Sequence, residues 1–318
     1  MNIIQKKHSL LAYDSSKNKT WDSVVEQARN GHFMFLRNYM DYHADCFEDA
    51  SFLLMRGHKV VAILPAHRQG DGLTSHSGLS FGGWLQTSRC LHNDIAAGFE
   101  LLGQEMRLRG LKQLVYTPSP YPYHTEPCGD DLYLLEKLGA QCIQVRLSAF
   151  IATQHLSKRN SKFRWLLQNG EKLTPGKINE TTDIERFWEH LSRFLVERHG
   201  SKPVHTVDEM RLLKKRFPRN IRLFVLHNEN EWLAGMVLFI SRNVLRCQNL
   251  FYFNRTGQDA LTNRLYESIR LNVDTQRPWL DFGTSMNPDT EELVSQLHLQ
   301  KELFGARGIP IKTFEWVP

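Results

Sequence analysis

The chain has 318 residues, a formal net charge of +6 and a pI of about 9.0. This length favours two domains of about 150 residues each. Hydrophobic residues make up 41% of the chain and charged residues 23%, which is typical of a globular protein, and no apolar run approaches the roughly 20 residues of a membrane-spanning helix. Residues 1–19 are polar and lack a signal-peptide core, so we expect a cytoplasmic protein without stable membrane insertion.

The basic charge balance suits an anionic partner, such as acyl-CoA, a nucleotide-sugar, a membrane surface or nucleic acid. No run reaches five like charges, so nucleic acid is not the expected partner. The five cysteines form no C-x-x-C pair, and the 14 histidines contain neither H-E-x-x-H nor H-x-H. This pattern argues against disulfides and zinc, and we expect no metal.

In chain order, the first half opens with helical periodicity over 21–50, interrupted at Asn30-Gly31. Apolar runs predict strands at 51–55, 60–66 and 79–85, of which the first two read as a hairpin. A helix is predicted over 92–108 and a strand over 113–117, followed by a loop with four prolines. A short helix at 132–138, a strand at 143–151 and a basic helix at 157–168 complete this part of the chain.

The second half repeats the order of the first. Its predicted helices are 184–199, 207–216, 260–273 and 291–299, and its predicted strands are 221–226, 234–241, 244–254, 279–282 and 311–316. Each half thus combines helices, three antiparallel strands, a long helix and a further strand. The halves show no identity by eye, so the order of elements alone favours two related α/β (α+β) domains.

Several short motifs occur in a fixed order. They include Asn30-Gly-His-Phe-Met-Phe-Leu-Arg37, the glycine-bearing segment 75–83, residues 199–205 and 217–221, Asp281-Phe-Gly-Thr284, and Lys301-Glu-Leu-Phe-Gly305. Together they resemble the FemAB/FemX-like N-acyltransferases of the GNAT superfamily, and most closely a sugar N-acyltransferase subgroup. The resemblance implies two tandem GNAT-like domains with mixed, mostly antiparallel sheets flanked by helices and an active-site cleft between them. It implies an acceptor domain at 1–150 and an acyl-CoA domain at 151–318.

In such proteins the pyrophosphate of acyl-CoA meets a loop at the start of a helix, because free N–H groups and the helix dipole favour anions there. The matching segment here has a single glycine, which departs from the usual [QR]-x-x-G-x-[GA] pattern. The resemblance implies donor contacts from Leu250, Asn254, Arg255, Thr256, Gly257, Gln258 and Arg307.

Five side chains are candidates for the chemistry. Lys301 would stabilise a developing oxyanion or a phosphate, and its alternative is a solvated cation at a helix end. Asp281 would accept the proton of an attacking ammonium, or it would bind backbone N–H groups at the strand end. His76, His205 and Tyr252 are further candidate bases. No Ser-His-Asp arrangement is recognisable, so a covalent acyl-enzyme is not expected.

The acceptor site is expected in the cleft between the domains, with most of its residues on the first domain. Glycines let a ligand approach the backbone closely, although they would equally ease a bend in a strand. An arginine suits a diphosphate, and tyrosines suit a sugar or base ring. The expected substrate-binding residues are Arg37, Tyr39, Tyr42, Ser77, Gly78, Phe81, Gly82, Gly83, Tyr121 and His205.

These expectations define a transferase that moves an acyl group from acyl-CoA to the amine of a nucleotide-linked amino deoxy sugar, for surface polysaccharide such as lipopolysaccharide. The resemblance implies that the nucleotide is dTDP. The amine would attack the thioester directly. One alternative is an aminoacyl-tRNA-dependent FemAB-type transferase that acts on a peptidoglycan precursor. Another is an inactive module that binds a nucleotide-sugar or nucleic acid.

Overall fold

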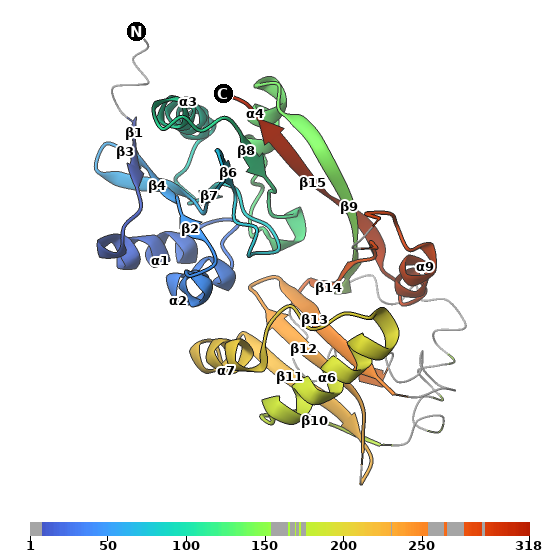
Figure 1. Ribbon diagram of the computed structural model, residues 1–318. Helices are drawn as coiled ribbons and strands as arrows, with labels where there is room; N and C mark the ends of the chain where they lie inside the picture. The colour runs from blue at the N-terminus through green and yellow to red at the C-terminus, as the bar shows by residue number, and fades with distance from the viewer. Residues whose placement is uncertain are drawn as a thin grey trace. The chain divides into compact units, whose positions relative to one another are not determined.

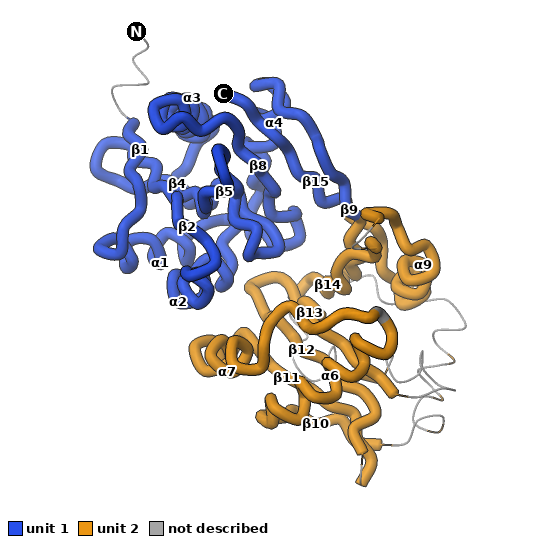
Figure 2. The backbone as a smooth tube through the Cα atoms, viewed as in Figure 1, with its two compact units in different colours: residues 1–146, 310–318 blue, residues 147–309 orange. Residues whose placement is uncertain are grey.

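The computed structural model describes residues 8–153, 176–229, 231–253, 277–287 and 290–318, together with positions 165, 169, 172, 264 and 265. The chain forms two compact units, which Figure 2 colours separately. The first comprises 1–146 and 310–318, and the second comprises 147–309. The helices expected at 157–168 and 260–273 lie mostly outside the described residues.

The first unit combines two groups of strands with helices (Figure 1). One sheet has the order β1-β3-β4-β7, and β8, β6, β5 and β2 follow β15 in the other group. The elements are β1 (His8–Ala12), α1 (Asn18–Gln27), α2 (Arg37–Met40), β2 (Glu48–Asp49), β3 (Phe52–Arg56), β4 (Lys59–Leu64), β5 (His67–Gln69), β6 (Gly72–Thr74), β7 (Leu85–Gln86), α3 (His92–Leu108), β8 (Leu114–Tyr116) and α4 (Asp130–Lys137).

The second unit has an open sheet in the order β10-β11-β12-β13-β14-β9. The strands are antiparallel except for β13 and β14, which run parallel. The elements are β9 (Gln141–Ala152), β10 (Lys177–Thr181), α6 (Ile184–His199), α7 (Val207–Arg216), β11 (Ile221–His227), β12 (Trp232–Ile240), β13 (Val244–Tyr252), β14 (Trp279–Thr284), α9 (Ser295–Leu303) and β15 (Arg307–Trp316). By residue number, β9 and β15 each belong partly to both units.

The local sequence explains the limits of several helices. Helix α6 begins after Asp183, whose carboxylate accepts from the N–H of Arg186, and it ends at Gly200 in the left-handed conformation. Helix α7 begins with a capping box between Thr206 and Glu209. These signals explain why the predicted limits of α6 and α7, like those of α3, match the structure.

Other predictions need correction. The expected strand over 79–85 is mostly loop, and only Leu85–Gln86 forms a strand, because the glycines serve close packing instead. The predicted helical stretch at 21–50 is divided into α1, α2 and short 3₁₀ turns. Strands β1, β2, β5, β6 and β10 were not predicted, because they are short or carry few apolar residues. The mixed α/β class with mostly antiparallel strands is confirmed.

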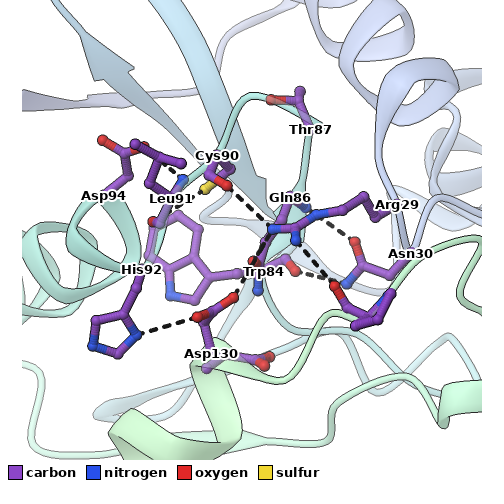
Figure 3. A network of polar contacts seen from close by, with 12 residues as sticks. Arg29, Asn30, Trp84, Gln86, Thr87, Cys90, Leu91, His92, Asp94 and Asp130 are labelled. Carbon is purple, nitrogen blue, oxygen red and sulfur yellow. Dashed lines mark hydrogen bonds and ion pairs between the residues drawn. The ribbon is translucent and has the colours of Figure 1, made fainter.

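A partly buried polar network fixes the proline-rich loop of the first unit (Figure 3). The Arg29 guanidinium donates to the side chain of Gln86 at 2.9 Å and to the carbonyls of Cys90 and Pro127 at 3.3 and 3.0 Å. The carbonyl of Arg29 in turn accepts from the backbone N–H of Thr125 at 2.7 Å. Arg29 therefore ties the end of β7 and the approach to α3 to this loop.

Residues from 310 onward complete the first core. Phe314 and Trp316 on β15 are buried in the same cluster as Phe99 of α3 and Tyr116 of β8. The rings of Phe99 and Trp316 meet edge to face, with centroids 5.5 Å apart. The first unit is therefore built from two separate parts of the chain.

Within the described residues, no helix is long and apolar enough to cross a membrane.

Candidate active site

The second unit contains a point at which its two parallel strands stop pairing. The ladder between β13 and β14 covers only Val244–Arg246 and Trp279–Asp281, whereas β13 continues to Tyr252 and β14 to Thr284. On the other side of β14, its antiparallel pairing with β9 is also interrupted, between Asp281 and Thr284. The backbone N–H and C=O groups that follow Asp281 on β14 therefore lie outside the regular parallel ladder.

A β-bulge lies just beyond the same point on β13. Val237 pairs with Asn249 and Leu238 pairs with Cys247, so Gln248 is the extra residue. A bulge leaves the backbone groups of its extra residue outside the ladder, and bulges are frequent beside active sites. The backbone N–H of Gln248 is therefore a candidate hydrogen-bond donor. The periodicity of the sequence could not reveal this bulge.

Asp281 lies at the last pair of the parallel ladder and is only 1% exposed. Its carboxylate accepts from Arg246 Nη1 at 2.8 Å, from Ser148 Oγ at 3.1 Å and from the N–H of Gly283 at 2.7 Å. A buried carboxylate needs such partners to offset its lost hydration. This arrangement favours the second expectation for Asp281, the binding of backbone N–H at the strand end, over the role of base. Arg246 and Ser148 were not among the residues predicted from the sequence.

Lys301 reaches the same strand end from α9. Its ammonium donates to the carbonyls of Gly283 and Thr284 at 3.0 and 2.9 Å. An ammonium group carries three N–H donors, and the third has no protein partner in the described part of the chain. Burial lowers the pKa of Lys301 to about 8, and the charges of Cys247 and Asp281 oppose that shift. Lys301 is therefore not the solvated cation of the alternative interpretation.

Two buried polar atoms accompany Lys301. The hydroxyl of Ser285, directly after β14, is fully buried, and no protein group within the described ranges forms a hydrogen bond with it. His298 lies one helical turn before Lys301 on α9, and its Nδ1 is likewise without a protein partner in those ranges. Buried polar atoms of this kind call for a water or ligand partner. The neighbourhood of Lys301 thus retains hydrogen-bonding capacity.

The remaining candidates of the second unit are more dispersed. Tyr252, at the end of β13, packs its ring 4.8 Å from that of Phe194, and Leu250 is half-buried on the same strand. Arg307 is exposed and donates to the carbonyl of Ala306. His205 lines a surface groove beside α6. The expected donor loop, Asn254, Arg255, Thr256, Gly257 and Gln258, lies outside the described residues.

In the first unit, three predicted residues line one cavity of about 220 Å³: His76, Ser77 and Phe81. His76 has a positive φ of 65°, which is uncommon for a residue other than glycine. Burial, together with the neighbouring His67 and His43, lowers the pKa of His76 to about 3. The imidazole is therefore neutral at physiological pH, and it could accept or donate a hydrogen bond in this cavity.

The predicted glycines serve packing. A Cβ on Gly82 would lie closer than 3.0 Å to the carbonyl of Ser75, and one on Gly78 would meet the ring of His43. Gly83 has a φ of +87°, and its Cβ would lie 2.6 Å from the Tyr116 hydroxyl. Protein atoms already occupy the space beside these glycines, so the geometry favours the strand-bend interpretation over ligand contact.

Arg37 is also placed differently from the expectation. It is 2% exposed, forms ion pairs with Asp49 and Asp41, and its guanidinium lies 3.2 Å from the ring centroid of Tyr13 and 4.1 Å from that of Trp21. These contacts correct the expected role as a diphosphate ligand, because the charge is engaged inside the unit.

The aromatic residues expected beside Arg37 divide between buried and exposed positions. Tyr39 is buried, and Tyr42 stacks on His43. Tyr121, in the proline-rich loop, is 58% exposed. Among the described residues, no group of three or more His, Cys, Asp or Glu is arranged to hold a metal ion.

Comparison with proteins of known structure identifies the fold. No family model matches the chain, and no curated protein matches its sequence. A crystal structure of FemX superposes with a TM-score of 0.68 at 11% identity, and the match covers 98% of this chain and 97% of FemX. The chain has the FemX fold. L-PGS from Bacillus licheniformis matches with a TM-score of 0.60 at 11% identity over 95% of this chain and 91% of its own.

A conserved protein of unknown function from Bacteroides thetaiotaomicron matches with a TM-score of 0.58 at 8% identity, covering 97% of this chain and 99% of its own. Because these sequence identities are low, the comparisons establish the FemX fold only. The function has to be inferred from the residues of the site.

Proposed function

We propose that the protein is an N-acyltransferase whose reaction takes place beside the end of β14. The observation that carries the proposal is the position of Lys301 Nζ. It is fixed by two carbonyls at the point where the parallel ladder stops, and it keeps one N–H donor for a ligand. Acyl transfer to an amine requires such a donor, because negative charge develops on the carbonyl oxygen when the amine attacks.

In the proposed reaction, the amine nitrogen forms a bond to the acyl carbon and the bond to the leaving group breaks. The proton lost by the amine passes to the leaving group, either directly or through a base. The Lys301 ammonium would donate to the oxyanion, and the backbone amide of Gln248 is a second candidate donor. Asp281 would keep Arg246 and Gly283 in place, which makes it a positioning residue. Tyr252 remains a candidate base, whereas a pKa of about 3 makes His76 a weak one.

For the donor, we propose acyl-CoA, and for the acceptor the amine of a nucleotide-linked amino sugar. The sequence motifs support this assignment through the resemblance. The donor would lie along β13, beside Leu250 and the segment 254–258, with Arg307 as a further contact. On the first unit, the acceptor would use the cavity lined by His76, Ser77 and Phe81 together with the exposed Tyr121.

The FemX fold supports a second candidate, transfer of an aminoacyl group from aminoacyl-tRNA. Besides FemX, one similar structure is the C-terminal domain of a proposed lysylphosphatidylglycerol synthetase from Agrobacterium fabrum. The basic pI of about 9.0 is compatible with a polyanionic donor.

A donor assay distinguishes the two candidates. The protein would be incubated with an amino-sugar nucleotide and a panel of acyl-CoAs, and thiol release would be followed. In parallel, aminoacyl-tRNAs would be offered with amine and lipid acceptors, and the loss of labelled amino acid from tRNA would be measured. If turnover is seen with one of the two donor classes and requires Lys301, the candidate function that uses this donor is supported. Binding of donors without turnover in either arm would contradict both candidates and favour a binding module.

A further inference from the structure

A cavity of about 470 Å³ lies in the first unit between α1 and the β3–β4 hairpin. Helix α1 supplies one wall, which includes Lys19 and Ser23, and the hairpin supplies Arg56 and Lys59. Arg89, before α3, lines a third side. The cavity thus brings together side chains that are up to 70 positions apart in the sequence.

The lining is strongly basic. It contains four lysine or arginine residues and one histidine, His58, and it contains no aspartate or glutamate. Arg56 is neutralised by an ion pair with the buried Asp94 at 2.7 Å. Where the structure describes the chain, Lys19, Lys59 and Arg89 form no ion pair. Three positive charges therefore meet in one concavity without a protein counter-charge.

Several other surface cations of this protein are neutralised locally. Lys112 pairs with Asp71 at 2.7 Å, and Arg222 pairs with Glu180 at 2.6 Å. Arg211 pairs with both Glu185 and Asp208. The three cations of the cavity differ from these pairs. Like charges grouped in a concave, partly low-dielectric site raise the local potential and attract anions.

The uncharged lining residues narrow the class of ligand. Thr20 and Ser23 offer hydroxyls, and Gln27 offers an amide that already donates to Ser23 at 2.9 Å. No Phe, Tyr or Trp side chain lines the cavity, and His58 is the one ring in its lining that could stack on a nucleobase. The volume falls in the range of pockets that take small molecules. Phosphate oxygens match this set, because they accept several charge-assisted hydrogen bonds at once.

We propose that this cavity binds a phosphorylated small molecule, such as a sugar phosphate, which it recognises through the phosphate. The site belongs to the first unit and shares no residue with the Lys301 site of the second. The proposal therefore does not depend on the acyl-transfer reaction.

The test uses the full chain and isothermal titration calorimetry with ribose 5-phosphate, with ribose as the uncharged control. The wild type should bind ribose 5-phosphate, whereas ribose should give no heat. Lys59→Gln combined with Arg89→Gln should weaken binding by at least about tenfold, the loss expected when one or more charge-assisted hydrogen bonds are removed. Lys19→Gln provides an independent variant on α1. Arg56 is not changed, because it stabilises the buried Asp94.

Lys215→Gln is the matched control, since it removes the same charge from an exposed position on α7. It should bind ribose 5-phosphate as the wild type does. The proposal is overturned if the wild type does not bind ribose 5-phosphate, or if the double variant binds it equally well. It is also overturned if single-stranded RNA binds to the same residues while ribose 5-phosphate does not, because the site would then serve a polyanion. Circular dichroism confirms that the variants are folded.

Discussion

Lys301 Nζ lies 3.0 Å from the carbonyl oxygen of Gly283, a residue whose φ is +70° and whose Cβ position is open. The lysine thus binds the backbone at the one place where β14 bends away from a regular strand. This contact fixes the ammonium group and leaves space beside it.

Lys301→Met should lower kcat/KM by about ten- to a thousandfold, the range expected when an electrostatic contact to the reacting oxygen is lost. It should also cost about 1–3 kcal/mol of stability, because two carbonyls lose their donor. Steady-state kinetics and urea unfolding measure the two effects. Lys312→Met, at an exposed position of β15, serves as the control. Unchanged kinetics in folded Lys301→Met would refute the proposed role.

The pH profile of the reaction offers a separate test. If Lys301 acts as a cationic donor, kcat should fall as pH rises through about 8, where burial places its pKa. Lys301→Arg keeps the charge and should move this descending limb to higher pH. A limb that is the same in wild type and Lys301→Arg would show that another group titrates.

The same shift predicts a change in stability with pH. The folded pKa of Lys301 is about 8 and that of the unfolded chain is near the ordinary 10.5, so the unfolded state binds more protons between these values. The free energy of unfolding should therefore contain a contribution that rises with pH over this window. Lys301→Met should remove that contribution, which urea titrations at pH 7.5 and 10 would detect.

His76 predicts a change in stability of the same sign at lower pH. Its folded pKa is about 3 against an ordinary value of 6.5, so the unfolded state binds more protons in this interval and stability falls as pH decreases from 6.5 towards 3. His76→Asn tolerates the positive φ and should reduce this acid sensitivity. Thermal unfolding at pH 7 and 4.5 measures the effect, with the exposed His58→Asn as control. Equal acid sensitivity in wild type and His76→Asn would contradict the prediction.

Gly83→Ala should destabilise the protein by about 3 kcal/mol, because it combines an unfavourable φ with a clash against Tyr116. The Tyr116 hydroxyl accepts from the N–H of Trp84 and donates to Asp131, both at 2.6 Å, so it cannot move without cost. Gly57→Ala is the control, since Gly57 has a φ of +60° but open space around it, and it should cost only about 1–2 kcal/mol. Equal losses in both variants would exclude the steric explanation.

Much of the fold follows from patterns that are local in the sequence. Helices α3, α6 and α7 were predictable because their apolar spacing and caps lie within a few residues of one another. Asp281 and Lys301 were selected by motif. Arg246 and Ser148 were not, because they meet Asp281 through strand pairings that join distant segments. The burial of Arg37 was equally hidden, since Tyr13 and Trp21 surround it only after folding.

The contribution of Phe314 and Trp316 to the first core has a consequence for synthesis on the ribosome. Residues 1–146 emerge first, but their core stays unfinished while the whole of 147–309 is translated. Translation proceeds at about 5–20 residues per second, so apolar surface around Phe99 remains uncovered for many seconds. The second unit, which is continuous in the chain, can complete its own core first. The nascent protein would then depend on chaperones at its beginning rather than at its end.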